Sequence, residues 1–130
     1  MYILILEDEK RNFNRLKRLL EEIDATHHVA GPLTSIAEAV EWLRMNPAPD
    51  LILADIRLTD GLSFDALRQS SVSSPVIFTT AYDEYAIQAF KFNSFDYLLK
   101  PVNADELAVA IQKVNRYSNI QQGGYDDIRL

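Results

Sequence analysis

The chain has 130 residues with a net charge of −6, and 48% of them are hydrophobic, which fits one domain with its own core. It contains no cysteine, which excludes disulfides, thiolate metal sites and cysteine nucleophiles. The negative charge disfavours direct contact with nucleic acid. No apolar run approaches the roughly 20 residues that span a bilayer, and the first residues lack the pattern of a signal peptide. We therefore expect a cytoplasmic protein without membrane contact.

The first half of the chain alternates apolar runs with helical periodicity. Ile3 to Leu6 predicts a buried strand. Apolar residues at steps of three and four then predict a helix; they are Phe13, Leu16, Leu20 and Ile23. The stretch HHVAGPL predicts a second strand that its Gly-Pro pair closes. Ser35 and Glu38 form a capping box in front of a second helix, which the stretch NPAP ends.

The second half continues the alternation. Leu51 to Ala54 predicts a third strand, and a short helix over Phe64 to Gln69 follows after a turn. Val76 to Phe78 predicts the fourth strand, followed by a helix from Asp83 to about Phe92. Tyr97 to Leu99 predicts the fifth strand.

The last helix is expected to begin at Asn103, which forms a capping pattern with Glu106. Its apolar stripe consists of Leu107, Ile111, Val114 and Tyr117. The periodicity is lost from Ser118, so we expect a domain over residues 1–117 and a linker or tail over residues 118–130. The alternation of strands and helices predicts an α/β fold, with a parallel sheet, helices on both faces and right-handed crossovers.

Polar residues follow the predicted strands. Glu7 and Asp8 come after the first strand, and Asp55 comes after the third. Thr80 ends the fourth strand and Lys100 follows the fifth. In open parallel sheets the reactive groups gather beyond the carboxyl ends of the strands, so we expect these side chains to share one edge of the sheet.

Three carboxylates at one edge cannot all stay ionised without a counter-charge. Lys100 supplies one positive charge, and oxygen ligands suit a hard cation such as Mg²⁺ or Mn²⁺. A carboxylate beside such a cation can accept a phosphoryl group, so we expect Asp55 to be the nucleophile. The basic stretch from Lys10 to Arg18 is interpreted as the solvated face of a helix.

This pattern resembles the receiver domain of two-component response regulators over about Met1 to Tyr117. The acidic pair, the aspartate, a Thr-Ala pair and a Lys-Pro pair, each after its own strand, carry the resemblance. It implies a flavodoxin-like, doubly wound (βα)5 sandwich with a five-stranded parallel sheet of order 2-1-3-4-5. It also implies Mg²⁺-dependent phosphorylation by a sensor histidine kinase.

The resemblance assigns a role to each site residue. Asp55 would be the phosphorylation site. Thr80 and Lys100 would contact the phosphate, and Tyr97 would be the switch aromatic. The Lys100–Pro101 peptide bond would be cis. The metal ligands that the resemblance implies are Glu7, Asp8, Asp55 and the backbone carbonyl of Arg57.

One stretch narrows the resemblance. FTTAYDEYAIQAFKFNSFDYLLKP is similar to receivers that precede a LytTR-type (LytR/AlgR-like) DNA-binding domain, so transcription control would require an output domain absent from this chain. Two positions depart from the common pattern. Glu7 stands where many receivers have aspartate, and Thr59 stands where many have proline. Neither change removes a group that the site needs.

Phosphorylation is expected to promote a homodimer. In the fourth predicted helix, Tyr85, Ile87 and Phe92 lie beside or outside the stripe that a sheet can bury. Charges of both signs surround this face; they are Lys91, Asp96, Lys113 and Arg116. We therefore expect the face formed by the fourth helix, fifth strand and fifth helix to pair across a twofold axis.

Two other functions are weighed against the signalling switch. An Asp-nucleophile phosphatase of related fold usually needs a second aspartate two residues after the nucleophile, where this chain has Arg57. A pseudo-receiver that only binds proteins would have lost the acidic pair, the aspartate or the lysine, and this chain retains all of them. We therefore expect a phospho-accepting switch and not an enzyme, with the pseudo-receiver as the alternative.

Overall fold

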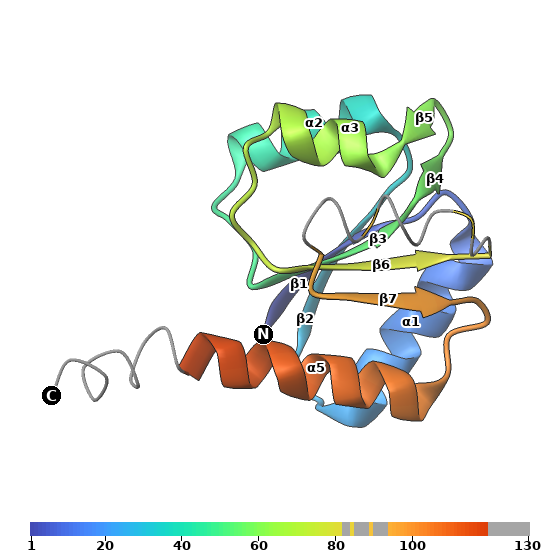
Figure 1. Cartoon of the computed structure of the whole chain (residues 1–130), viewed down its shortest axis with the longest axis vertical. Helices are drawn as coiled ribbons and strands as arrows, with labels where there is room; N and C mark the ends of the chain where they lie inside the picture. Colours follow the sequence, from blue (N-terminus) through green and yellow to red (C-terminus); the bar gives the residue numbers. More distant parts are fainter. Residues whose placement is uncertain (82–83, 85–88, 90–93, 120–130) are drawn as a thin grey trace, which may run out of the picture.

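A computed structural model describes residues 1–81, 84, 89 and 94–119. Within them, one parallel sheet has the strand order β2-β1-β3-β6-β7 (Figure 1). Its strands are β1 (Tyr2–Leu6), β2 (His28–Leu33), β3 (Leu51–Asp55), β6 (Val76–Thr80) and β7 (Asp96–Leu99). The predicted order 2-1-3-4-5 is confirmed, because β4 (Arg57–Leu58) and β5 (Gly61–Leu62) form a separate small hairpin. That hairpin was not predicted.

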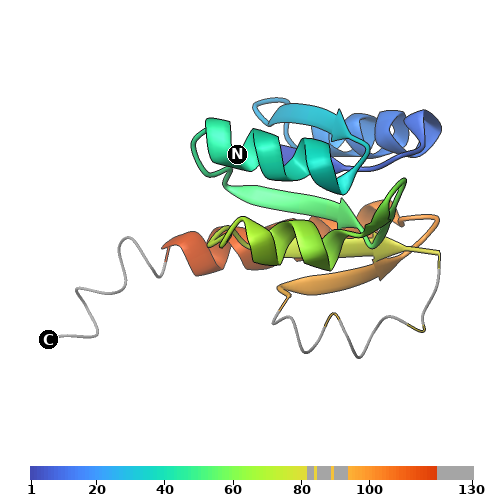
Figure 2. The same ribbon diagram turned by 90° about the horizontal axis from the view of Figure 1, so that it is seen from above.

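The helices cover both faces of the sheet, as predicted (Figures 1 and 2). They are α1 (Lys10–Ile23), α2 (Ile36–Met45), α3 (Ser63–Gln69) and α5 (Ala104–Asn119). α1 and α5 lie on one face, and α2 and α3 lie on the other. Most of the helix predicted from Asp83 to Phe92 lies outside the described residues. No helix in the described part of the chain has the length and apolar character needed to cross a bilayer.

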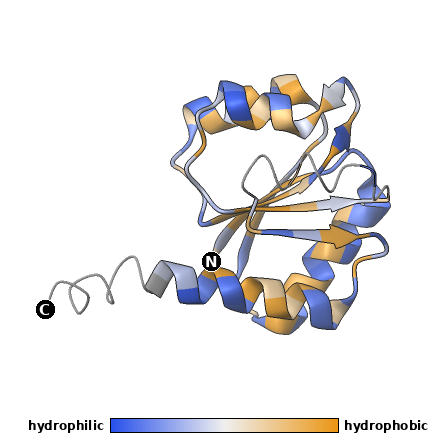
Figure 3. Cartoon of the chain, in the orientation of Figure 1, coloured by the Kyte–Doolittle hydropathy of each residue, from blue (hydrophilic) through white to orange (hydrophobic). Residues whose placement is uncertain are grey.

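Each face of the sheet packs against its own hydrophobic core. In β1, Ile3 and Ile5 point toward the α1–α5 side, whereas Leu4 and Leu6 point toward the α2–α3 side. Both sides are fully buried, so the strand is a continuous apolar run rather than an alternating one. Figure 3 shows the same division along the helices, where hydrophobic and hydrophilic residues alternate.

β2 differs from its prediction. The strand passes through Gly31 and Pro32 and ends only at Leu33. Gly31 has φ +109°, and a Cβ atom there would lie 2.6 Å from the carbonyl oxygen of Ile5, so only glycine fits. The Gly31–Pro32 peptide bond is cis, and the pairing with β1 shifts register between Leu4 and Leu6. Pro32 is tolerated because β2 is an edge strand.

The start of α2 is capped from two directions. The Ser35 hydroxyl accepts a hydrogen bond from the Glu38 N–H at 3.1 Å, as predicted. The Glu38 carboxylate accepts from the Thr34 N–H at 3.0 Å, one residue earlier than in a standard capping box. Asp60, in the β4–β5 turn, accepts from the Ile36 N–H at 2.6 Å. The turn that follows the Asp55 strand is thereby tied to α2.

Candidate functional site

The carboxyl edge of the sheet brings together the acidic side chains that follow different strands. Asp55 is the last residue of β3, and Glu7 and Asp8 directly follow β1. One carboxylate oxygen from each of these residues lies within 4.8 Å of the other two. Such proximity of three acids requires positive charge nearby.

Lys100 supplies that charge. Its Nζ donates to Glu7 Oε1 at 2.7 Å and to Asp55 Oδ2 at 2.8 Å. Its backbone N–H donates to the Thr80 carbonyl at 2.8 Å, which continues the β6–β7 pairing beyond the end of β7. The Lys100–Pro101 peptide bond is cis.

Glu7 is the most deeply buried acid of the site, with 1% of its surface exposed. Both of its oxygens are engaged, because Oε2 accepts from the Glu9 N–H at 3.1 Å. Burial raises the pKa of Glu7 to about 7, against the hydrogen bond from Lys100, which lowers it. Burial alone would lower the pKa of Lys100, but its hydrogen bonds to Asp55 and Glu7 outweigh burial and hold that pKa above its ordinary value.

An open pocket of about 640 Å³ gives access to Asp55. Asp8, Arg57 and Lys100 line it with Asp55, and Asp8 is exposed. The Asp55 carboxylate also accepts a hydrogen bond of 3.3 Å from the Arg57 N–H. Carboxylate oxygens are ligands that Mg²⁺ prefers.

The remaining predicted residues lie around this edge. Thr80 is fully buried at the end of β6. Tyr97 lies opposite Phe78 in the β6–β7 pairing and packs against the core on the α2–α3 side. Neither side chain lines the pocket that contains Asp55.

The sequence analysis gave no role to two polar residues near the site. Thr79, the partner of Asp55 in the β3–β6 register, is fully buried, and its hydroxyl has no hydrogen-bond partner among the described residues. Arg15 donates from Nη2 to the Val102 carbonyl at 2.8 Å. The interpretation of the stretch from Lys10 to Arg18 as a solvated face is therefore wrong for Arg15. No sequence signal separates it from its basic neighbours.

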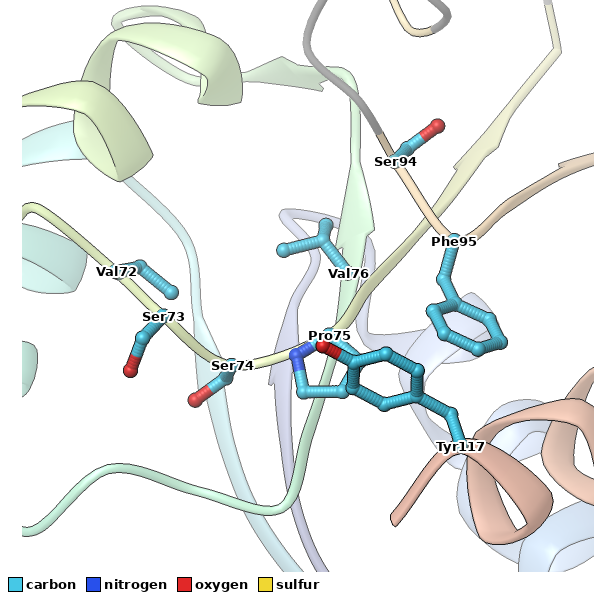
Figure 4. Close-up of a pocket in the computed structure, with 8 residues that line it drawn as sticks. All are labelled: Val72, Ser73, Ser74, Pro75, Val76, Ser94, Phe95 and Tyr117. Carbon is cyan, nitrogen blue, oxygen red and sulfur yellow. The ribbon is translucent and has the colours of Figure 1, made fainter. Parts of the chain in front are cut away.

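A second pocket, of about 470 Å³, lies at the opposite, amino edge of the sheet (Figure 4). It is lined by serines, valines and a proline and by the rings of Phe95 and Tyr117. Phe95 precedes β7 and Tyr117 comes from α5, and their rings meet edge to face with centroids 5.3 Å apart. None of the described residues that line it is charged, so these residues do not provide the groups for phosphoryl chemistry.

Comparison with known proteins shows which family the chain resembles. Residues 3–112 match the family model of the response regulator receiver domain. The chain is 38% identical to the positive alginate biosynthesis regulatory protein of Pseudomonas aeruginosa, over 93% of this chain and 50% of that protein. It is 36% identical to the sensory transduction protein LytT of Enterococcus faecalis, over 89% of this chain and 48% of LytT.

A solved structure is also similar. The response regulatory domain of protein mrkE from Klebsiella pneumoniae aligns with a TM-score of 0.78 at 28% identity, covering 90% of this chain and 97% of that one. By contrast, the chain spans about half the length of the curated relatives it matches.

Proposed function

Because the chain belongs to the family of response regulator receiver domains and is related to LytTR-type regulators, we propose that a sensor histidine kinase transfers a phosphoryl group to Asp55. Receiver domains are signalling switches rather than classical enzymes. The observation that carries the proposal is the Lys100 ammonium, 2.8 Å from Asp55 and 2.7 Å from Glu7, beside a pocket open to Asp55.

The chemistry follows from these contacts. A carboxylate oxygen of Asp55 forms the new P–O bond while the P–N bond of the donor phosphohistidine breaks and the imidazole leaves. Phosphoryl transfer depends mainly on positioning and on neutralising the phosphoryl oxygens. Lys100, already at the carboxylate, can supply positive charge to those oxygens.

The residues of this edge fit Mg²⁺ or Mn²⁺. Asp8, Asp55 and the Arg57 carbonyl would hold the cation, and Glu7 would complete the acidic group on its buried side. When bound, the cation neutralises negative charge on the phosphoryl group. Among the described residues, Lys100 forms ion pairs with both Glu7 and Asp55.

The switch would act through the surface beside β7 and α5. We infer that phosphate draws the Thr80 hydroxyl and Lys100 inward and shifts Tyr97. Leu99 and Val109 on this surface are 47% and 49% exposed, which supports it as the contact of a homodimer. The fourth-helix residues expected there, Tyr85, Ile87, Lys91 and Phe92, lie outside the described residues.

The output would be transcription, through a LytTR-type DNA-binding domain in the half of the relatives' length that this chain does not span. The receiver itself would then sit in the cytoplasm with its kinase, without its own contact to nucleic acid or membrane. A pseudo-receiver that binds partners without phosphorylation is the alternative function. The direct contact between Lys100 and Asp55 favours the phospho-acceptor.

The test is intact-mass measurement after incubation with Mg²⁺ and acetyl phosphate. The chain should gain one phosphoryl group, and Asp55→Asn, which keeps the shape but removes the nucleophile, should gain none. An Asp55→Asn protein that is still phosphorylated would rule out the assignment. An unmodified wild-type chain would favour the pseudo-receiver.

A further inference from the structure

We propose that Arg15 is a positioning residue for phosphoryl transfer: its guanidinium holds the loop after β7 and thereby sets the place of the Lys100 ammonium. The part of this inference that concerns reaction rate rests on the proposed function. The anchoring of Lys100 does not.

The first observation is a single long-range hydrogen bond. Arg15 Nη2 donates to the Val102 carbonyl at 2.8 Å and joins residues 87 positions apart in the sequence. Because the donor is charged, such a bond is stronger than one between neutral groups. Val102 is 3% exposed and belongs to the core between α1 and α5. The bond therefore fixes the loop to α1 at a partly buried point.

The second observation is the position of Lys100 between two fixed points. On the sheet side its backbone N–H is bound to the Thr80 carbonyl at 2.8 Å. On the helix side the chain is bound two residues later, where Arg15 holds Val102. The Lys100 side chain extends from this segment to Asp55 and Glu7. Loss of the Arg15 bond would remove this hydrogen bond on the helix side and leave the segment held there by the packing of Val102.

The third observation is that packing alone explains Arg15 poorly. Its Nε is buried and has no hydrogen-bond partner among the described residues. A buried donor without a partner destabilises the folded state, so an apolar side chain would suit this position better if stability were its only purpose. Arg11 and Arg18 line the same surface hollow, but their side chains are exposed. They serve as matched controls for the loss of one positive charge.

The rate experiment uses acetyl phosphate and Mg²⁺ and measures phosphorylation of Asp55 in five proteins. They are the wild type, Arg15→Met, Arg15→Lys, Arg11→Met and Arg18→Met. Arg15→Met keeps the aliphatic stem and should react about tenfold more slowly, because small displacements of a catalytic group cost rate steeply. Arg15→Lys restores a donor and should recover part of the rate, whereas both controls should match the wild type.

A second readout follows Lys100 without any phosphoryl chemistry. In NMR spectra, its ε-methylene signals, identified by their loss in Lys100→Met, should be shifted from those of exposed lysines in the wild type. In Arg15→Met they should move toward the exposed lysines, but in Arg18→Met they should not. If the wild type shows these shifts but cannot be phosphorylated, the proposed function is ruled out. The anchoring of Lys100 by Arg15 would still be supported.

Three results would overturn the inference. The first is an Arg15→Met protein that reacts at the wild-type rate with unchanged Lys100 signals. The second is an equal loss of rate in all the arginine variants, which would indicate a general effect of charge. The third is an Arg15→Lys protein as slow as Arg15→Met.

Discussion

The two edges of the same sheet differ in what they bury. At the carboxyl edge, Glu7 and Asp55 are buried acids that contact one lysine. At the amino edge, the described residues that line the pocket beside β6 and β7 are uncharged and include hydroxyls and aromatic rings. The strands of a parallel sheet all begin at one edge and end at the other, and reactive groups gather beyond the carboxyl ends. Side chains that are costly to bury mark the carboxyl edge as the candidate reactive edge.

Under the proposed function, stability and chemistry separate in space. The contacts around the amino-edge pocket are neutral; they include the Phe95–Tyr117 ring pair and the hydrogen bond from Ser74 to the Pro49 carbonyl at 2.7 Å. The carboxyl edge keeps a buried ion pair whose desolvation offsets much of its attraction. Substitutions at the carboxyl edge should change reaction, metal binding and pH dependence together. Substitutions at the amino edge should change stability and leave the reaction and metal binding unchanged.

The largest effect is expected from Lys100→Met. Removal of the ammonium leaves Glu7 and Asp55 buried without their counter-charge, which should cost about 3 kcal/mol of unfolding free energy in metal-free protein at pH 8. Urea denaturation measures this loss. Lys113→Met is the control, because its pair with Asp96 at 3.3 Å is largely exposed and should contribute less than about 1 kcal/mol. Equal losses in the two variants would contradict the contrast between buried and exposed pairs.

The second effect is a pH dependence at the carboxyl edge. The pKa of Glu7 is raised from its ordinary 4.5 to about 7 by burial, so the folded state binds the proton more tightly than the unfolded state. Metal-free stability should therefore fall as pH rises through this window, by on the order of 2 kcal/mol, and then level off. In Glu7→Gln, the unfolding free energy should depend less steeply on pH. Denaturant titrations with chelator at pH 5 and pH 8 test it, and an unchanged slope in Glu7→Gln would exclude Glu7 as the source.

The third effect is stabilisation by metal. A cation that binds only the folded state should raise the unfolding free energy by about 1.4 kcal/mol at tenfold its dissociation constant. Asp8→Ala should abolish most of this gain at the same Mg²⁺ concentration. Thermal unfolding with and without Mg²⁺ measures it, with Asp65→Ala on α3 as the control. If Mg²⁺ stabilises Asp8→Ala as much as the wild type, the cation binds elsewhere.

A smaller effect is expected at the amino edge. Tyr117→Ala removes the edge-to-face contact with Phe95 and should cost about 1 kcal/mol of stability, because Tyr117 is already 45% exposed. The rate of phosphorylation by acetyl phosphate should not change. A rate that falls along with stability would show that the two edges are coupled.

The smallest effect is a pH dependence of opposite sign at the amino edge. His27 precedes β2, and its pKa is lowered, first by burial and then by the amino-terminal charge. Its Nε2 is buried with no partner among the described residues. The folded state favours the neutral form of His27. The contribution of His27 to stability is therefore present above its ordinary pKa of 6.5 and is lost as pH falls below it. His27→Gln should reduce the loss of stability at acid pH. His28→Gln, at an exposed position, should leave that loss unchanged.

Much of this contrast could be predicted from sequence, because local patterns determine it. The polar residues after the apolar runs indicated the reactive edge, and the Ser35–Glu38 pair indicated the start of α2. The path of β2 through Gly31 and Pro32 could not be predicted, because it depends on a positive φ and an edge position in the assembled sheet. The inward-facing Arg15 was missed because its acceptor, the Val102 carbonyl, is distant in sequence.

The central claim, that the carboxyl edge is the reactive end, is tested most directly by locating the phosphoryl group. The chain is phosphorylated with acetyl phosphate and Mg²⁺, treated with borohydride to reduce the acyl phosphate, and mapped by peptide mass spectrometry. We expect reduction of Asp55 to homoserine, and of no other acidic residue. Modification at any other carboxylate, with Asp55 intact, would contradict the claim.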